Sequence, residues 1–245
     1  MKRFGIIGHP VAGSMSPLLF AAAYEGRYPY DLIEEASFET AWQRFLADYE
    51  GVNVTAPFKQ QAFGRADKAS EAATRCQAAN LIVKTPDGLA AYNTDVAGVL
   101  ESLRPEVQSG QKALVVGAGG AARAAIVAAQ MLGLEVTVAG RTPSKTEALG
   151  REMGCRAIGL EEATSETPAV VIYTLPGSAP VPSGLPLSRA VVLEAEYKHP
   201  QLSSAPCRKY LSGRLWLVHQ ALSGYKLFTG KDPSVQRIWQ TINTQ

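Results

Sequence analysis

The stretch ALVVGAGGAARAAIVAAQ, residues 113–130, constrains the fold most, because an apolar strand runs directly into glycines and then into a long alanine-rich helix. Gly117 permits a tight turn, Gly119 lets backbone N–H groups approach a bound group closely, and the small Ala122 allows the helix to pack on the strand. A glycine-rich turn can also serve packing alone. In this strand, turn and helix context, the spacing predicts an α/β unit that binds the pyrophosphate of a dinucleotide.

The next strand indicates which dinucleotide. Sites for NAD usually end this strand with an acidic residue that binds the ribose hydroxyls, whereas VTVAGRTPSK, residues 136–145, contains none. Arg141 offers a planar fork suited to a phosphate, Thr142 a hydroxyl, and Lys145 a second positive charge. These side chains could instead be solvated surface groups. Their position after the second strand of a glycine-loop unit favours NADP.

Strand and helix patterns alternate along the chain and predict two α/β lobes around a cleft. In the first lobe, a helix over 16–24, begun by a serine cap and Pro17, accompanies five strand candidates: RFGIIG, YDLIEEA, VNVTAP, AANLIVK and LAAYNTD. The second lobe starts at QKALVVGAGG and includes a helix near 143–153. We expect residues 1–100 with 216–245 to form the substrate-binding catalytic domain, and residues 101–215 to form a Rossmann-like domain for NADP.

Composition excludes several functional classes. The 245 residues carry a net charge of only +2 with scattered basic residues, so we expect a small-molecule partner and no nucleic acid. Glycine and arginine interrupt the long apolar stretches, which predicts a cytoplasmic chain without a membrane contact. The three cysteines are far apart and the histidines lack partners at ligand spacing, so neither disulfides nor a metal site is expected. Without heptads or a long apolar face, we expect a monomer or weak dimer.

Short polar residues gather at the ends of the first-lobe strands, in the segments GSMSP, NVTAPFK, AAN and YNTD. Such strand ends are where α/β proteins bind ligands. Each residue alone could be a helix cap or a turn residue. Together they suit a substrate with many hydroxyls: Ser14, Ser16, Asn53, Thr55, Asn80, Asn93 and Thr94.

Several segments resemble, in order and spacing, the signatures of shikimate dehydrogenase and its quinate-using relatives. They are IGHPVAGSMSP, NVTAPFK, AANLI, YNTDVAG, VVGAGGAARAA, GRTPSK and VHQALSGYKLFTG, from residue 5 to about residue 230. The resemblance implies an NADP-linked reduction of 3-dehydroshikimate to shikimate, in the pathway to aromatic amino acids.

The resemblance also implies roles for individual residues. Lys59 and Asp95 would be the catalytic pair, with Lys59 giving a proton to the ketone oxygen as hydride arrives. A structural salt bridge is the alternative for this pair. The implied substrate contacts are Ser14, Ser16, Thr55, Asn80, Tyr197 and Gln220. The implied cofactor contacts are Gly117, Gly119, Gly120, Ala121, Arg141, Thr142, Lys145 and Trp216.

The chain departs from the family pattern at several places. Gly13 stands where the family usually has His, and Gly140 where it has Asn. The segments VIYTLPGS and EAEYKHP replace two family motifs, and Trp216 replaces a Met. These departures leave two alternatives open: a dehydrogenase of the same family for quinate or a related polyol acid, and a ligand-binding regulatory protein with little turnover.

Overall fold

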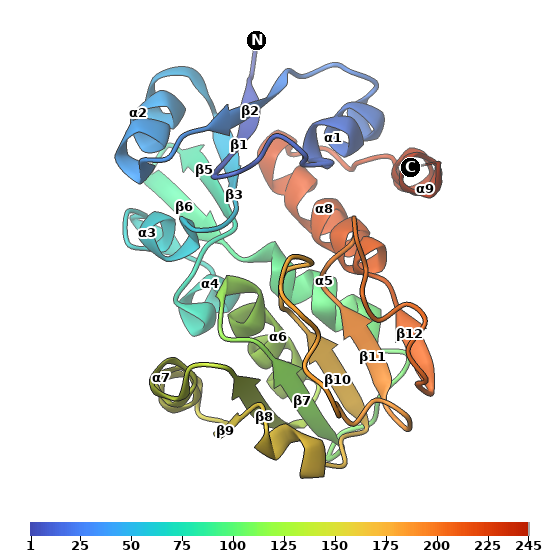
Figure 1. Cartoon of the computed structure of the whole chain (residues 1–245). Helices are drawn as coiled ribbons and strands as arrows, with labels where there is room; N and C mark the ends of the chain where they lie inside the picture. The colour runs from blue at the N-terminus through green and yellow to red at the C-terminus, as the bar shows by residue number, and fades with distance from the viewer. Residues whose placement is uncertain (245) are drawn as a thin grey trace. The chain divides into compact units, whose positions relative to one another are not determined.

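The structure, a computed structural model, describes residues 1–244 (Figure 1). The chain divides into two compact units: Met1–Thr94 with the residues from Gln220 onward, and Asp95–His219. The boundaries expected from the sequence lie a few residues from these positions. Each unit contains one six-stranded sheet with helices, so the predicted α/β class with two lobes is confirmed.

A mixed sheet forms the centre of the first unit, with strand order β2-β1-β3-β5-β6-β4. The strands are β1 (Phe4–Gly8), β2 (Tyr30–Glu34), β3 (Gly51–Val54), β4 (Lys68–Ala69), β5 (Leu81–Thr85) and β6 (Gly88–Tyr92). β1 pairs in parallel with β2 and β3, whereas β5 runs antiparallel to both β3 and β6. The parallel half needs long crossovers, and α1 and α2 supply them.

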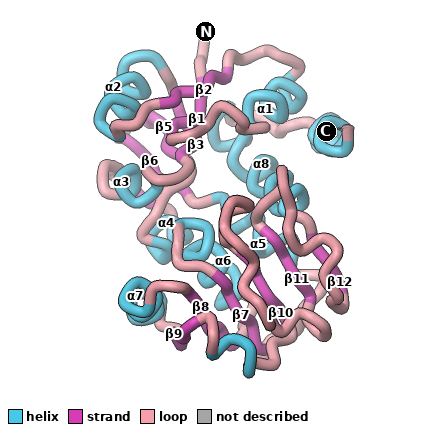
Figure 2. Tube along the Cα trace, viewed as in Figure 1, coloured by secondary structure: helices cyan, strands magenta, loops and turns pink. Residues whose placement is uncertain are grey.

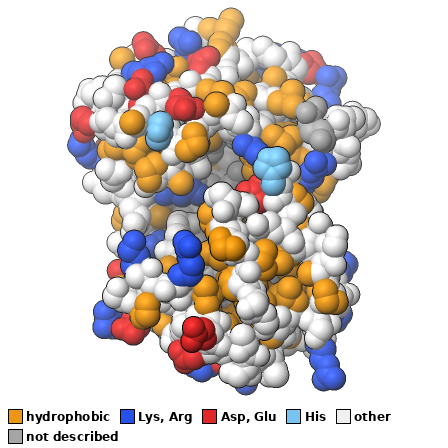
Figure 3. All heavy atoms as spheres, in the orientation of Figure 1, with side chains coloured by type: hydrophobic (Ala, Val, Ile, Leu, Met, Phe, Trp, Pro, Cys, Tyr) orange, Lys and Arg blue, Asp and Glu red, His pale blue; other side chains and the backbone are white. Residues whose placement is uncertain are grey.

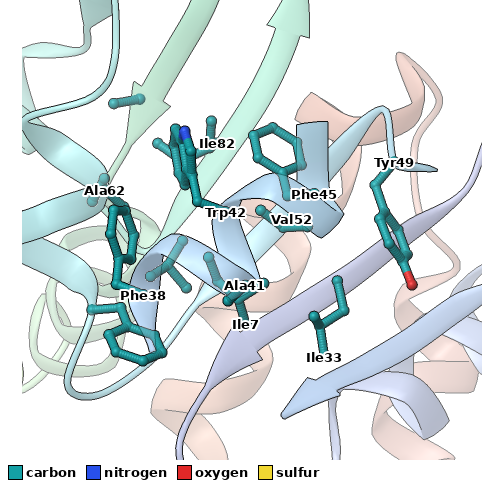
Figure 4. Packing of buried hydrophobic residues seen from close by; sticks show 14 of the residues in the cluster. Ile7, Ile33, Phe38, Ala41, Trp42, Phe45, Tyr49, Val52, Ala62 and Ile82 are labelled. Atoms are coloured by element: carbon teal, nitrogen blue, oxygen red, sulfur yellow. The ribbon is translucent and has the colours of Figure 1, made fainter. Parts of the chain in front are cut away.

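The helices of the first unit are α1 (Ser16–Tyr24), α2 (Phe38–Asp48), α3 (Lys59–Phe63), α4 (Glu71–Cys76) and α9 (Val235–Asn243). Helix α2 buries Phe38, Ala41, Trp42 and Phe45, which recur at the spacing of one helical face. Figure 4 shows these side chains packed with strand residues, among them Ile82. Burying each large apolar side chain stabilises the fold by about 1.5–3 kcal/mol. Helix α2 therefore contributes strongly to holding the first-unit sheet together.

An all-parallel sheet forms the centre of the second unit, with strand order β12-β11-β10-β7-β8-β9. The strands are β7 (Lys112–Val116), β8 (Glu135–Gly140), β9 (Arg156–Gly159), β10 (Val170–Tyr173), β11 (Val191–Glu194) and β12 (Lys209–Leu211). The helical segments are α6 (Gly120–Met131), α7 (Pro143–Met153) and the short 3-10 helix η1 (Glu162–Ser165). Helices α5 (Thr94–Leu103) and α8 (Gly213–Thr229) contain the boundaries between the units.

Loops replace helices in the crossovers after β10 and β11 (Figure 2). They bury Leu187 and Leu202 in the same core cluster as Val171 and Val192 of the strands, and so take over the covering role of a helix. The carboxylate of Glu194, fully buried at the end of β11, anchors the second loop. It accepts bonds from the backbone N–H groups of Gln201 and Leu202 at 2.7 and 3.1 Å, and from the Tyr210 hydroxyl at 2.7 Å.

The sequence-based elements are confirmed for most of the chain, including the bounds of α1 and α7. The short elements α3, β4 and β12 were not predicted. The serine cap expected for α1 is wrong: the cap position is Met15, already in a helical conformation, and its side chain makes no capping bond. A capping residue needs an extended backbone, which Met15 lacks.

None of the helices between residues 1 and 244 combines the length and apolar character that a membrane span requires. On the face drawn in Figure 3, basic and acidic side chains are interspersed. Over the same described residues, no group of three or more His, Cys, Asp or Glu side chains is arranged to hold a metal ion.

Candidate active site

Ser14 and Ser16 lie at the start of α1, where a short turn follows β1. The Ser14 hydroxyl donates to Oγ of Ser16 at 3.2 Å and accepts from the Ser16 backbone N–H at the same distance. The Tyr225 hydroxyl on α8 donates to the Ser16 carbonyl at 3.2 Å. The two hydroxyls therefore lie side by side, and α8 holds the turn that carries them.

Asn80 is the centre of a buried polar network and is only 3 % exposed. Its Oδ1 accepts from the backbone N–H of Thr94 at 2.7 Å, and its Nδ2 donates to Oε1 of Gln220 at 3.1 Å. The Nδ2 group also lies 3.0 Å from Oγ1 of Thr94. Because buried polar groups need partners, these three residues fix one another. The structure thus brings together Asn80 and Gln220, which are 140 positions apart in the sequence.

A tyrosine extends this network in a way the sequence reasoning missed. The Tyr30 hydroxyl on β2 donates to Oδ1 of Asn53 at 2.6 Å, and Nδ2 of Asn53 donates to the carbonyl of Asn80 at 3.2 Å. Burial raises the pKa of Tyr30 well above its ordinary value, so its hydroxyl stays protonated and available as a donor. Tyr30 gave no signal because an aromatic residue in a strand normally indicates packing.

Lys59 is the first residue of α3 and is partly buried. The backbone N–H of Ala79 donates to the Lys59 carbonyl at 2.9 Å, and the ring of the preceding Phe58 is buried. The Lys59 backbone is therefore bound to Ala79, the residue just before Asn80 and two residues before β5. The cation that the sequence shows just after the apolar strand β3 thus stands at the first position of α3.

Thr55 follows β3 and is held by its backbone N–H, which donates to the Ile7 carbonyl at 2.9 Å. Its methyl group packs so closely on Gly8 that a Cβ there would lie 2.3 Å from Cγ2 of Thr55. Only glycine at position 8 admits this approach.

Asp95 is the second residue of α5 and is 7 % exposed. It immediately follows Thr94, whose backbone is bound to Asn80, and belongs to the second unit. A carboxylate in the first turn of a helix is favoured by the helix dipole.

The glycine loop has the geometry expected for a phosphate site. Gly117 has φ +122°, and a Cβ there would lie 2.3 Å from Oγ1 of Thr174. Gly119 is the cap residue of α6 and has no side chain, so it makes no capping bond to the first helical N–H groups. The backbone N–H groups of Gly120 and Ala121 stand at the amino end of α6. Such N–H groups bind anions.

The second basic site lies at the start of α7. Arg141, Thr142 and Lys145 are all exposed, and within residues 1–244 the side chains of Arg141 and Lys145 make no hydrogen bond or ion pair. Thr142 is the cap residue of α7, and its side chain makes no capping bond. Two unpaired cations and a hydroxyl at a helix amino end form an arrangement that suits a phosphate group.

Two more of the expected site residues, Trp216 and Tyr197, belong to the second unit. Trp216 is 5 % exposed, and its indole packs on Gly98 of α5, where a Cβ would lie 2.5 Å from Cδ1 of Trp216. Tyr197 is partly buried in the loop between β11 and β12. Glu196 next to it accepts bonds from the N–H groups of Lys198 and His199 at 2.7 and 3.3 Å, which fixes the turn after Tyr197.

Comparisons with known proteins agree with this arrangement. The family model of the shikimate dehydrogenase substrate binding domain matches residues 6–82. A shikimate dehydrogenase (NADP(+)) of Thermus thermophilus is 35% identical, the match covering 96% of this chain and 95% of the relative. One of Acidiphilium cryptum is 36% identical over 94% of this chain and 91% of the relative.

Solved structures show the same fold. The shikimate 5-dehydrogenase of Thermus thermophilus in complex with NADP(H) and shikimate has a TM-score of 0.85 at 30% identity, covering 100% of this chain and 99% of that one. An Ael1 enzyme from Pseudomonas putida has a TM-score of 0.81 at 27% identity, covering 100% and 98%.

A glycine loop on a parallel sheet, joined to a unit rich in buried amides and hydroxyls, defines an oxidoreductase of the two-unit dehydrogenase class. Its relatives over nearly the full length are NADP-dependent. The chain belongs to the shikimate dehydrogenase family.

Proposed function

We propose that this protein catalyses the reversible, NADP-dependent reduction of 3-dehydroshikimate to shikimate. The observation that carries the proposal is the buried network that joins Asn80, Thr94 and Gln220, in the same unit as the paired Ser14 and Ser16 hydroxyls. It offers several fixed donors and acceptors, which a polyhydroxylated substrate requires. The relative of known structure from Thermus thermophilus binds NADP(H) and shikimate.

Within this proposal, the unit of Met1–Thr94 and the residues from Gln220 onward binds the substrate. Ser14 and Ser16 would bind one end of it, and Thr55, Asn80 and Gln220 its ring hydroxyls. Tyr197 of the second unit would add one more contact. Because the fold already fixes these groups, less conformational entropy is lost when the substrate binds.

Lys59 and Asp95 would carry the proton transfer. The bound dinucleotide would supply the hydride to the ketone carbon. As the ketone oxygen gains negative charge, the Lys59 ammonium would stabilise it and then give it a proton. In the oxidative direction, the same amine would accept the hydroxyl proton. Asp95 would orient the ammonium through charge.

The second unit would bind NADP. Gly117, Gly119, Gly120 and Ala121 would hold the pyrophosphate at the amino end of α6. The unpaired Arg141 and Lys145, with Thr142, would bind the 2′-phosphate of the adenosine ribose. Trp216 would pack near the nicotinamide.

A second candidate is a dehydrogenase of the same family that acts on quinate or a related polyol acid. Gly13 favours it, because an exposed glycine replaces the family's histidine just before the Ser14 and Ser16 hydroxyls and leaves more room there. A regulatory protein that binds the ligand with little turnover would show the same site without activity. For the main proposal we infer a cytoplasmic monomer or weak dimer.

Initial rates of NADP⁺ reduction test the proposal. The purified full chain is assayed with shikimate and with quinate, each with NADP⁺ and with NAD⁺. We expect turnover to be fastest with shikimate and NADP⁺. Faster turnover with quinate would move the assignment to the second candidate. No turnover with any pair, in a folded protein that binds NADP⁺, would indicate the regulatory role.

A further inference from the structure

The carboxyl end of β8 contains a close contact that bears on the choice of dinucleotide. Gly140 is the last residue of β8. Sites for NAD carry an acidic side chain roughly 20 residues after the glycine loop, at the end of this strand. At Gly140, a Cβ would lie 2.3 Å from Oγ1 of Thr146, and 3.4 Å from both Cβ and Cγ2 of that threonine. The space for any side chain at position 140 is therefore filled by one hydroxyl group.

That hydroxyl cannot easily move away. Thr146 is 1 % exposed, and its Oγ1 donates to the Thr142 carbonyl at 3.0 Å. The backbone N–H of Thr146 donates to the same carbonyl, also at 3.0 Å. Turning Oγ1 away from Gly140 would break the first of these bonds in a buried place, where a lost bond costs the full desolvation of the donor.

The same bond connects Thr146 to the basic site. Thr142 is the cap residue of α7, and the unpaired side chains of Arg141 and Lys145 lie on either side of it in the sequence. Thr146 thus fixes the backbone that presents both cations, while its hydroxyl keeps the end of β8 free of a side chain.

We propose that Gly140 and Thr146 together set the cofactor specificity: Thr146 is a positioning residue whose hydroxyl excludes an acidic side chain from position 140 and whose bond to Thr142 holds the backbone that presents Arg141 and Lys145. This inference rests on the proposed binding of NADP. An acidic residue at position 140 would not by itself create an NAD site, because its Cβ would collide with Oγ1 of Thr146. Removing the Thr146 hydroxyl would be needed as well.

The first test is a set of stability measurements that does not depend on any cofactor. Gly140→Ala is introduced into the natural sequence and into Thr146→Ala and Thr146→Ser backgrounds, and Tm is measured. We expect Gly140→Ala to lower Tm by about 3 °C or more, as overpacking does. With Thr146→Ala the same change should cost less than half of that. Thr146→Ser keeps Oγ and is the matched control, so there the full loss should persist. An equal loss in all three backgrounds would overturn the contact.

The second test measures kcat/KM for NADP⁺ and NAD⁺ in the natural protein, Gly140→Asp, Thr146→Ala and the double variant. We expect the ratio of NAD⁺ to NADP⁺ to rise about tenfold or more in the double variant over Gly140→Asp alone, the worth of one charge-assisted bond. Thr146→Ala should raise KM for NADP⁺ more than it lowers kcat, and Thr146→Ser should restore KM. A full switch by Gly140→Asp alone would overturn the proposal.

The two tests separate the two ways of failing. A natural protein that prefers NAD⁺ would contradict the proposed cofactor, whatever the stability measurements show. A natural protein that prefers NADP⁺, with no difference between the Thr146→Ala and Thr146→Ser backgrounds, would contradict only the role of Thr146.

Discussion

The two polar regions of this molecule are built in opposite ways. The region around Asn80 is buried, and Thr94 and Gln220 bind Asn80 directly. In the basic region at the start of α7, Arg141 and Lys145 are exposed and make no bonds within the described residues. Groups of the first kind are positioned by the fold itself, whereas groups of the second kind remain hydrated until an anion arrives. Substitutions should therefore couple ligand binding to folding in the first region and separate the two in the second.

Lys59→Ala should have the largest effect. In shikimate oxidation Lys59 would accept the hydroxyl proton, so its loss is expected to lower kcat by about 10²–10⁴-fold, the usual contribution of general acid–base catalysis. Lys59→Arg keeps the charge but stays protonated and so cannot accept the hydroxyl proton; it is the matched control and should be nearly as slow. Steady-state rates, with Tm and NADP⁺ affinity as checks on folding, measure this. Unchanged turnover in Lys59→Ala would remove Lys59 from the catalytic step.

Asn80→Ala should affect both stability and binding. The change leaves the Thr94 backbone N–H without its acceptor, so we expect the free energy of unfolding to fall by about 1–3 kcal/mol. The KM for shikimate should rise in the same variant. Asn80→Asp keeps the acceptor for Thr94 but loses the donor to Gln220, and should recover stability more than KM. Denaturant titration and initial rates distinguish the two effects, and a raised KM without lost stability would contradict the contrast drawn above.

Arg141→Ala should change binding alone. Its exposed, unpaired side chain predicts a change in unfolding free energy within about 0.5 kcal/mol. Losing one charge-assisted bond to a phosphate predicts a kcat/KM for NADP⁺ about 10- to 100-fold lower, with NAD⁺ hardly affected. Arg141→Lys keeps the charge without the fork and should be intermediate. A comparable loss with both dinucleotides would show that Arg141 does not bind the 2′-phosphate.

The smallest effect concerns pH and His219 on α8. Burial lowers the pKa of His219, and Glu101 opposes this by raising it. The unfolded chain then binds the proton more tightly, near pH 6.5, so the stability that neutral His219 contributes is present above that pH and is lost as the pH falls below it. His219→Gln should flatten the difference in unfolding free energy between pH 7.5 and pH 5.5. An equal slope in both proteins would show that other groups cause it.

Long, periodic elements were predictable from the sequence. Helix α7 begins at Pro143 and ends just before Gly154, and both residues are strong boundary signals. By contrast, β12 has three residues and α3 has five, too few for any period to be detected. Strand β4 has only two residues and was not predicted for the same reason.

The candidate site was predictable where a segment carries a motif. Thr94 and Asn53 were expected as polar strand-end residues, and the structure adds their bonds to Asn80. Tyr30 and Thr146 could not be found, because nothing in a sequence shows which distant backbone or side chain lies against them. The collision between Thr146 and a side chain at position 140 is a property of packing alone.

The loops that stand in for helices after β10 and β11 also have a consequence for hydrogen exchange. A loop amide normally exchanges quickly, yet those of Gln201 and Leu202 are bound to the fully buried Glu194 carboxylate. Their protection should follow the opening of this one carboxylate site instead of the fraying of a loop. Slow exchange of these two loop amides would therefore report on the Glu194 side chain, whereas slow amides that cover other parallel sheets report on a helix.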